Sequence, residues 1–439
     1  MKAFLGFAFK RIVGTAFALA LVGAIQTVSV ADVRGGRKVV DSSWSPDESA
    51  VAVLEDDPFF ENDRALDGGR FLRMVDIHHN KPLWTRRAKE LDGGLQEASS
   101  QSLIWIHQRN ILVLSFVAPN SRLKILILRA NDGKLLGRAT LAPSGSANGR
   151  FDSLVDSSGW RVGFLCRGLG ASGPLRVFDL RSRTCTSTIQ GVLSFLWAGT
   201  TLLVVRNPAD KMGQSKISIA EGRKIYPLSV GSQDHAIDNC TTDELGHLYV
   251  LTYSQRAPQN MAVSCYVLAG HTAHKQWERH WTTGLRTPGA DGLMASSTGW
   301  VAVDLPYGTD GSGNNRVWCV SKKQLYIPQQ IFADESYLAE MVSFAWRGQS
   351  LLFSTYAAAQ KSADMNDPDT LMVTKYHLFS PQTRSTHQVF SSNGLPDTWG
   401  ASPTLRRAIR FVKQDGREQT RVKDFVVENP PCSGSNKRQ

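Results

Sequence analysis

After residue 30, the 439-residue sequence has no apolar run long enough to span a bilayer, and no stretch keeps helical periodicity over several turns. It also lacks the G-x-S-x-G motif that presents a nucleophilic serine on a strand-to-helix turn. These absences exclude a protein with several membrane helices and favour an all-β chain. They leave no recognisable hydrolase nucleophile.

The N-terminus has the pattern of a secretory leader. Lys2, Lys10 and Arg11 precede or border an apolar run from Ile12 to Val30, and small residues permit cleavage after Ala31. A retained anchor helix is the alternative, because the run approaches membrane-spanning length. We therefore predict a signal peptide over residues 1–31 and a mature chain that is secreted or periplasmic.

Positive charge is in modest excess and is scattered along the chain. The net charge is +11, and removal of the three basic leader residues would lower it to +8. A nucleic-acid-binding protein usually clusters its basic residues. The distribution therefore predicts no dedicated nucleic-acid role.

One pattern returns eight times at intervals of about forty to sixty residues. Each copy has a short segment, often with Trp, then a turn, then an apolar strand. The copies are residues 44–53, 105–114, 156–165, 197–205, 242–251, 295–303, 346–353 and 401–411. A third strand and a hairpin follow most copies, as at Asn131-Asp132-Gly133-Lys134. Four antiparallel strands repeated in this way predict a β-propeller over residues 32–430, with eight blades favoured over seven and over a β-sandwich.

The last repeat lacks one strand before Pro430-Pro431, and residues 431–439 form a tail. The β-prone segment Arg37 to Val40 has no obvious partner in its own blade. We expect it to close the ring as the outer strand of the last blade, since an unpaired edge strand is a liability.

Two motifs carry a resemblance to known families. Ser43-Trp44-Ser45-Pro46-Asp47 resembles the "WSPDG" signature of TolB-like propeller repeats, and Ala401-Ser402-Pro403 keeps part of it. The segments 76–84 and 131–136 look like hairpins of quinoprotein-type propellers, although no two cysteines are adjacent here, as they are beside the cofactor of quinoprotein dehydrogenases. The resemblance implies a propeller and says little about chemistry.

The loops after each second strand are the most variable part of the repeat and share one face of a propeller. In the first, sixth and seventh repeats they are acidic, whereas the third to fifth present basic residues. The binding candidates are Asp56, Asp57, Phe59, Phe60, Asp63, Arg167, Arg206, Asp304, Tyr307 and Asp310. Asp364, Asp367 and Asp369 are candidate calcium ligands, with solvated turns as the alternative, because no loop completes the EF-hand pattern.

Other side chains favour structural roles. Trp44, Trp105, Trp197 and Trp346 recur at one position of the repeat, which indicates packing between blades. The spacing of Cys166 and Cys185, and of Cys240 and Cys265, predicts an intervening strand, so we expect mostly reduced thiols. His271, His274 and His280 are expected on a surface hairpin and not at a metal.

The sequence therefore predicts a monomeric extracytoplasmic propeller that binds a protein, peptide or glycan through its loop face. No cofactor is predicted, apart from possible calcium. The alternative is a metal-assisted hydrolase or lyase with carboxylates at an axial site. Binding is favoured because no acid/base pair or nucleophile motif is recognisable.

Overall fold

The computed structural model describes most of the chain between residues 38 and 424. The described ranges are 38–56, 69–79, 81–98, 100–118, 120–143, 150–167, 172–206, 216–231, 234–283, 292–307, 314–326, 340–347, 349–358, 372–393, 407–414 and 417–424. Contacts divide the chain into unit 1 (Met1–Ala257, Met261–His280 and Phe411–Arg421) and unit 2 (Pro258–Asn260, Trp281–Arg410 and Val422–Gln439). No helix in the described ranges is both long and apolar enough to cross a membrane.

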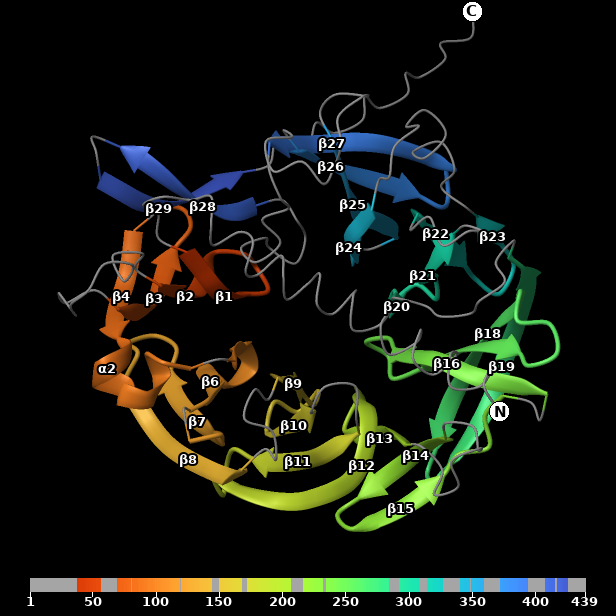
Figure 1. Cartoon of the computed structure of the whole chain (residues 1–439), viewed down its shortest axis with the longest axis horizontal. Helices are drawn as coiled ribbons and strands as arrows, with labels where there is room; N and C mark the ends of the chain where they lie inside the picture. The colour runs from red at the N-terminus through yellow and green to blue at the C-terminus, as the bar shows by residue number, and fades with distance from the viewer. Residues whose placement is uncertain are drawn as a thin grey trace, which may run out of the picture. The chain divides into compact units, whose positions relative to one another are not determined.

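Unit 1 begins with two four-stranded antiparallel sheets, each in chain order (Figure 1). The first contains β1 (Lys38–Trp44), β2 (Ala50–Asp56), β3 (Arg70–Asp76) and β4 (Lys81–Arg87). The second contains β5 (Ser100–Ile106), β6 (Ile111–Val117), β7 (Arg122–Arg129) and β8 (Leu135–Pro143). Short helices α2 (Ala88–Leu91) and η2 (Gly93–Leu95) connect them, and η3 (His107–Arg109) lies between β5 and β6.

A seven-stranded sheet follows, in which one long strand serves two meanders. Its strands are β9 (Arg150–Val155), β10 (Arg161–Arg167), β11 (Gly173–Asp179), β12 (Thr184–Ala198), β13 (Thr201–Arg206), β14 (Lys216–Glu221) and β15 (Lys224–Pro227). The first part of β12 pairs with β11 and the last part with β13, and both pairings include Val192. The outer strand of the third meander therefore continues as the inner strand of the fourth.

The fifth meander lies almost wholly in unit 1. It consists of β16 (His235–Thr242), β17 (Leu248–Ser254), β18 (Asn260–Ala269) and β19 (Thr272–Thr282).

Unit 2 contains two further four-stranded meanders. These are β20 (Gly292–Ala295), β21 (Val301–Tyr307), β22 (Asn314–Val320) and β23 (Leu325–Tyr326), then β24 (Glu340–Arg347), β25 (Ser350–Ala358), β26 (Met372–Ser380) and β27 (Ser385–Asn393). Finally, β28 (Arg407–Gln414) and β29 (Arg417–Asp424) form a two-stranded sheet whose residues are divided between the two units. The predicted all-β class and the antiparallel four-stranded repeat are confirmed.

The second strand of each meander is the most buried, as its apolar run predicts. In β2, the side chains from Val51 to Leu54 are inaccessible to solvent, and β6 repeats this pattern. Apolar clusters in unit 1 join the facing sides of successive meanders, for example Leu54 and Leu72 with Leu112 and Leu114. Because both faces of a sheet are covered, its second strand reads as a continuous apolar run without alternation.

The four repeated tryptophans occupy one structural position, as predicted. Each pairs with the second residue of the following strand, as Trp105 does with Leu112 and Trp197 with Leu202. The Trp197 indole N–H also donates to the Leu154 carbonyl at 3.2 Å. The Trp197 side chain therefore connects the first strand of the fourth meander to the first strand of the third.

The turn between the first and second strands of a meander, where the first strand is the innermost one, also repeats. A side-chain oxygen accepts a backbone N–H four or five residues ahead, as Ser45 Oγ does from Ala50 and Asp243 Oδ1 does from His247. Within these turns Glu48 and Gly246 have φ of 56° and 82°. Glu48 thus adopts the left-handed conformation at the position where the TolB-like signature has glycine.

The expected ring closure by Arg37 to Val40 is wrong for the described residues 38–40. Lys38 pairs with Asp56 and Val39 with Glu55, so these residues extend β1 in the first sheet. A register shift between Val39 and Asp41 lets the strand continue along β2. The segment has its partner within its own meander, which the sequence did not reveal.

Candidate binding surface

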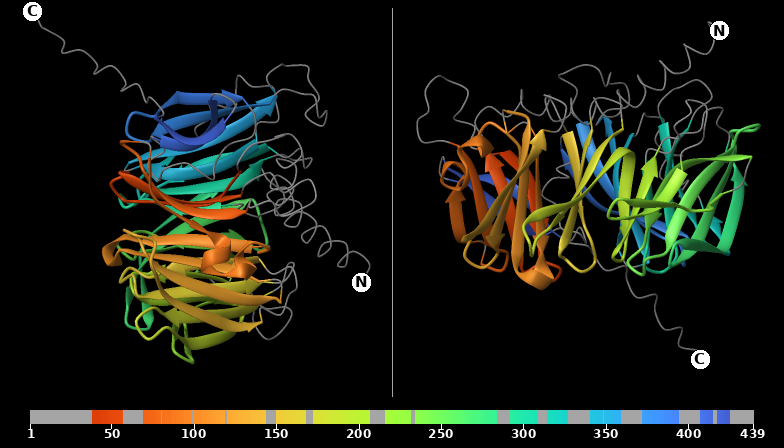
Figure 2. Two further views of the ribbon diagram at one scale, coloured as in Figure 1. Left: turned by 90° about the vertical axis from the view of Figure 1, so that its left-hand side faces the viewer. Right: turned by 90° about the horizontal axis from the view of Figure 1, so that it is seen from below.

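The hairpin turns of a meander emerge at one end of the sheet, and the loops after second strands emerge at the other (Figure 2). In unit 1, the turn end of the second to fourth meanders is formed by neighbouring polar segments. We call these segments the basic turn surface. They are residues 107–110, 129–134, 156–161, 179–183, 199–200 and 221–224.

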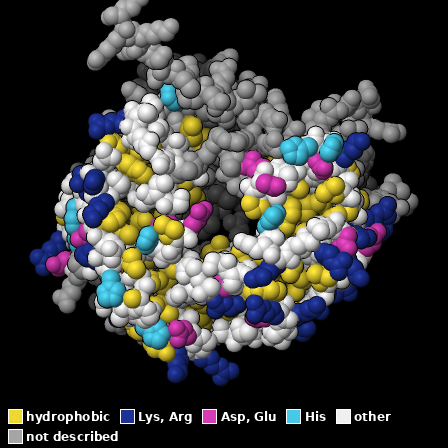
Figure 3. All heavy atoms as spheres, turned by 180° about the vertical axis from the view of Figure 1, so that it is seen from behind, with side chains coloured by type: hydrophobic (Ala, Val, Ile, Leu, Met, Phe, Trp, Pro, Cys, Tyr) yellow, Lys and Arg dark blue, Asp and Glu magenta, His cyan; other side chains and the backbone are white. Residues whose placement is uncertain are grey.

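Basic side chains outnumber acidic ones on this surface. Its eight basic residues are Arg109, Arg129, Lys134, Arg161, Arg181, Arg183, Arg223 and Lys224, and its four acidic residues are Asp132, Asp156, Asp179 and Glu221. Figure 3 shows Lys and Arg side chains in several patches along the rim and the lower part of one face, with acidic side chains among them. The whole chain has scattered positive charge, but the fold concentrates part of it on the basic turn surface.

Two arginines share one indole at the centre of the basic turn surface. The guanidinium carbon Cζ of Arg109, from the second meander, lies 4.4 Å from the ring centroid of Trp160 in the third. The Cζ atom of Arg181 lies at the same distance from that ring. Cation–π attraction to the indole face stabilises both positions.

Hydrogen bonds fix the first of these arginines. Arg109 Nε and Nη2 both donate to the Ser158 carbonyl, at 3.3 and 3.0 Å. Gly159 brings this turn close to the second meander, with φ of 69° and an added Cβ only 2.7 Å from Ile106 Cγ2. The turn that carries Trp160 is therefore packed tightly beneath Arg109.

A second Arg–Trp pair lies in the adjoining turn. Arg161 Cζ is 4.9 Å from the Trp197 ring centroid, and its Nε atom is 2.9 Å from Asp156 Oδ2. Its Nη2 atom donates to the Thr200 carbonyl at 2.6 Å. This arginine is compensated by a buried carboxylate and links the third meander to the fourth.

Five cations of the basic turn surface have no side-chain hydrogen bond or ion pair within the described ranges: Lys134, Arg181, Arg183, Arg223 and Lys224. All five are exposed. Arg183 adopts φ of 59°, and its side chain lies on the backbone of Gly137, where an added Cβ would be 3.0 Å from Arg183 Cδ. Charges that are exposed and uncompensated are available to an anionic partner.

The structure brings some of the sequence-predicted binding residues to the loop end. Asp56, Arg167 and Arg206 are the last residues of β2, β10 and β13 in unit 1, and Tyr307 is the last residue of β21 in unit 2. Asp304 lies within β21, and only 4% of its surface is exposed. Asp57, Phe59, Phe60, Asp63, Asp310, Asp364, Asp367 and Asp369 lie outside the described residues. Ligand binding by any of these residues stays a prediction.

The base of the first loop is anchored by buried charge. The Glu55 side chain is fully buried, and its Oε2 atom is 3.1 Å from Arg73 Nε. Arg70 Nη1 donates to the carbonyl of Leu95 at 3.0 Å. These contacts join the end of the first sheet to the connection that carries η2.

The three histidines considered for a metal site, His271, His274 and His280, make separate contacts. His271 Nε2 is 2.9 Å from Glu221 Oε1, and its ring stacks on Tyr226 at 3.7 Å. His280 contacts Glu278, and His274 contacts Thr272. Over the described part of the chain, no three potential ligands gather as a metal site would require.

The cysteines lie on the predicted strands. Cys166 and Cys185 are in β10 and β12, two strands apart, and the five described cysteines are free thiols. Burial raises the pKa of Cys240 to about 12 and that of Cys265 to about 11. Cys185 is the exposed member of the set.

A polar network holds one turn of the fifth meander. Asp243 Oδ2 accepts from the Tyr249 hydroxyl at 3.0 Å and lies 2.8 Å from His247 Nδ1. Burial first, and then the neighbouring charges, raise the pKa of Tyr249 above its usual value. The network keeps the tyrosine protonated and fixes the turn.

Sequence reasoning missed the basic turn surface because its residues are dispersed along the chain. Arg109, Trp160 and Arg181 come from three different turns, and no local motif joins them. A usable signal was the recurrence of arginine at or beside the hairpin turns of consecutive repeats.

No protein-family model matches the sequence, and no curated protein matches it. Several solved structures are similar in fold at low identity. The β-propeller domain of the Trilobed protease from Pyrococcus furiosus has 8% identity and a TM-score of 0.45, covering 80% of this chain and 97% of that one. The WD40 domain of SCAP from fission yeast has 9% identity and a TM-score of 0.47, covering 86% and 94%. The Dos1 propeller has 10% identity and a TM-score of 0.47, covering 85% and 90%.

The strand pairing itself defines the class of protein. Consecutive four-stranded antiparallel meanders, packed face to face in chain order within unit 1, have the organisation of β-propeller blades. The chain is thus an all-β protein of propeller type with a basic surface across three meanders.

Proposed function

We propose that this protein is an extracytoplasmic binding module that docks a protein or peptide partner on the basic turn surface. The N-terminal leader pattern supports the location, and the succession of meanders supports a single propeller of eight blades. A propeller presents its turns on a stable scaffold, so the surface does not need to fold upon binding.

One observation carries the proposal. Arg181, Arg183, Arg223 and Lys224 are exposed on turns of the third and fourth meanders, and no described side chain forms a hydrogen bond or ion pair with them. Like charges on one surface repel one another, and a partner with complementary charge relieves this repulsion. A docking role for this surface explains why the free protein keeps these mutually repelling charges together.

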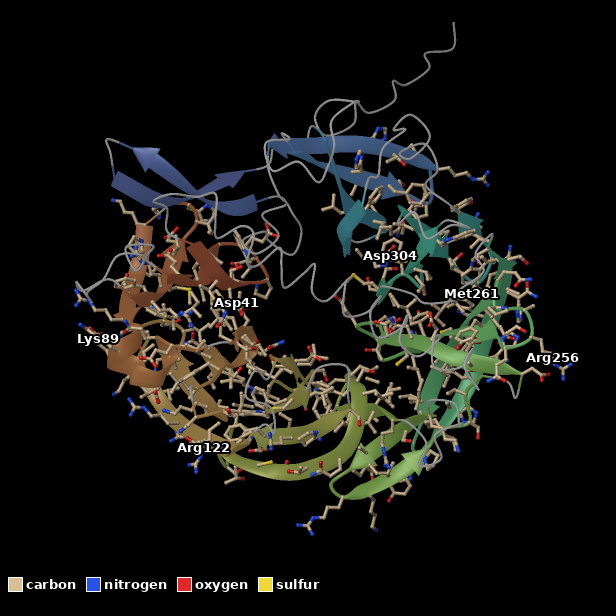
Figure 4. The ribbon with its side chains drawn as sticks, viewed as in Figure 1. Asp41, Lys89, Arg122, Arg256, Met261 and Asp304 are labelled. Atoms are coloured by element: carbon tan, nitrogen blue, oxygen red, sulfur yellow. The ribbon has the colours of Figure 1, made fainter. Side chains whose placement is uncertain are left out.

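The test compares two triple variants of the full chain. The first is Arg183→Gln with Arg223→Gln and Lys224→Gln on the basic turn surface. The matched control is Arg122→Gln with Lys216→Gln and Arg256→Gln, which removes the same charges at the loop end of unit 1. Arg122 and Arg256 reach into solvent there (Figure 4).

Each protein is used to capture cross-linked partners from the extracytoplasmic fraction of its source cells. We expect the first variant to lose partners that the wild type and the control retain. Equal capture by all three proteins contradicts the proposal. Loss in the control alone points to the loop end instead.

A further inference from the structure

Arg109, Trp160 and Arg181 form a defined centre within the basic turn surface. We infer that this centre binds an acidic polypeptide segment through two of its carboxylates. The inference rests on the proposed function and specifies the chemistry of the partner.

The two guanidinium groups are close together and form no ion pair with an acid in the part of the chain that the structure describes. Since each Cζ atom is 4.4 Å from the same ring centroid, the two lie at most about 9 Å apart. That distance is within about one Debye length at physiological ionic strength, so their fields add. Arg109 donates to a neutral carbonyl, and the Arg181 guanidinium lies over the indole without a hydrogen bond or ion pair to any described side chain.

The carboxylates on the turns that carry Trp160 and Arg181 are engaged elsewhere. Asp156 accepts from the side chains of Ser158 and Arg161. Asp179 Oδ1 accepts the backbone N–H groups of Arg181 and Ser182, which shapes the turn. Neither acid forms an ion pair with Arg109 or Arg181, so both guanidinium groups keep free N–H donors for a ligand.

The centre is organised before any ligand arrives. Two hydrogen bonds and the indole fix Arg109, while the indole and the Asp179-shaped turn restrain Arg181. Side chains that are already ordered lose less entropy on binding. The planar guanidinium also forms paired hydrogen bonds with a carboxylate, which an ammonium group does not.

The spacing favours a peptide over a single small anion. Alternate side chains of an extended peptide lie about 7 Å apart on one face, and glutamate side chains extend this reach. Two carboxylates at positions i and i+2 can therefore each meet one guanidinium. An inorganic phosphate is too small to form good hydrogen bonds with both guanidinium groups at once, and would bind mainly to one of them.

The surrounding charges favour a polypeptide over a nucleic acid. The exposed acids Asp132 and Glu221 interrupt the basic turn surface. A continuous phosphate backbone would be repelled at these points, whereas a peptide can place neutral or basic side chains there.

The probe is a fluorescein-labelled peptide of about twelve residues in which Glu alternates with Ser, at the spacing of an extended strand. Its matched control has Gln in place of Glu, and a single-stranded oligonucleotide of similar charge is the competing class. Fluorescence anisotropy with the full chain measures each affinity. We expect binding of the Glu peptide, weak or no binding of the Gln peptide, and weaker binding as salt is raised.

Variants then locate the site. Arg109→Gln and Arg181→Gln should each weaken binding of the Glu peptide by about threefold to tenfold, and the double variant by more. Arg129→Gln is the matched control, because Arg129 is on the same surface but is already 3.1 Å from Asp132. Arg109→Lys keeps the charge and should restore part of the affinity, which a folding defect would not allow.

Unchanged affinity in the Arg109→Gln/Arg181→Gln double variant overturns the inference, as does tighter binding of the oligonucleotide than of the Glu peptide. If Arg183→Gln with Arg223→Gln and Lys224→Gln abolishes partner capture while this double variant has no effect, the site is wrong and the proposed function stands. If neither variant changes capture, the proposed function fails as well.

Discussion

The carboxylate of Asp41 accepts the backbone N–H of Leu103 at 2.6 Å, which ties the innermost strand of the first sheet to that of the second. Ser43 Oγ accepts the N–H of Trp105 at 2.9 Å in the same way. An innermost strand has one edge without a ladder partner, and these side chains satisfy its donors. The polar side chains of β1 thus act as a substitute for a neighbouring strand.

Asp41 should make stability depend on pH. Burial raises its pKa from 3.8 to about 6, against the opposing effect of two backbone hydrogen bonds. A raised pKa means that the folded state binds this proton more tightly than the unfolded state. The contribution to stability is therefore present below pH 3.8 and is lost as pH rises through 6.

We expect the free energy of unfolding of the wild type, relative to Asp41→Asn, to increase by about 2 kcal/mol between about pH 7.5 and pH 4.5. Urea denaturation at several pH values measures this difference. Asp47→Asn is the control, because the pKa of Asp47 is lowered to about 2 by hydrogen bonds from serines. The Asp47 carboxylate stays ionised between about pH 4.5 and 7.5, so Asp47→Asn should not change the pH dependence in this way. Parallel pH profiles for the wild type and Asp41→Asn would contradict the raised pKa of Asp41.

Gly133 should be sensitive to a single added methyl group. Its φ is 65°, and a Cβ would lie 2.7 Å from Cε3 of Trp84, whose indole N–H donates to the Ala130 carbonyl. Gly133→Ala is expected to destabilise the protein by about 2–3 kcal/mol through backbone strain and overpacking.

Gly222→Ala separates these two causes. Gly222 has φ of 61° and no atom within 4 Å of an added Cβ, so only the backbone term of about 1 kcal/mol applies. Chemical denaturation of both variants gives the comparison. Equal losses would mean that the packing of Trp84 on Gly133 contributes nothing.

The Trp197 hydrogen bond can be measured by a matched pair of substitutions. Trp197→Phe removes the donor to Leu154, whereas Trp105→Phe removes a buried Nε1 atom that has no hydrogen-bond partner in the described structure. Both changes remove similar volume at the same position of the repeat. We expect Trp197→Phe to cost about 1 kcal/mol more in unfolding free energy than Trp105→Phe, and the opposite order would refute this account.

Thiol reactivity should follow exposure. Cys185 is exposed on β12, whereas Cys166, Cys265 and Cys319 are buried. Burial raises the pKa of all three buried thiols, which keeps them protonated and unreactive. Alkylation of the native protein, followed by peptide mass spectrometry, should label Cys185 first; faster labelling of Cys265 would contradict the described packing.

The repeat was predictable because its signals are local. Tryptophan, a turn and an apolar run mark the second strands, and residues such as Asn131 to Lys134 mark hairpins. The pairing of β1 was not predictable in the same way. From the sequence, residues 38–40 could pair with the first repeat or with the last one. In the structure they pair with β2, with a register shift between Val39 and Asp41 that no sequence motif marks.

The candidate site is formed by residues that are far apart in the sequence, so it was harder to predict from the sequence than the repeat was. The acidic loops are visible in the sequence, but the contacts of their side chains are not. Arg109, Trp160 and Arg181 meet because successive sheets align their turns, which depends on register and packing between sheets. Only the tendency of arginine to recur near turns can be read from the chain.

Strand β12 has a consequence for how the protein unfolds. Because its 15 residues belong to two meanders, the hydrogen bonds of the third and fourth meanders share one continuous backbone. A local opening at Val192 exposes donors and acceptors on both sides. The two meanders should accordingly exchange their amide hydrogens as one cooperative unit, the largest such unit in the described chain.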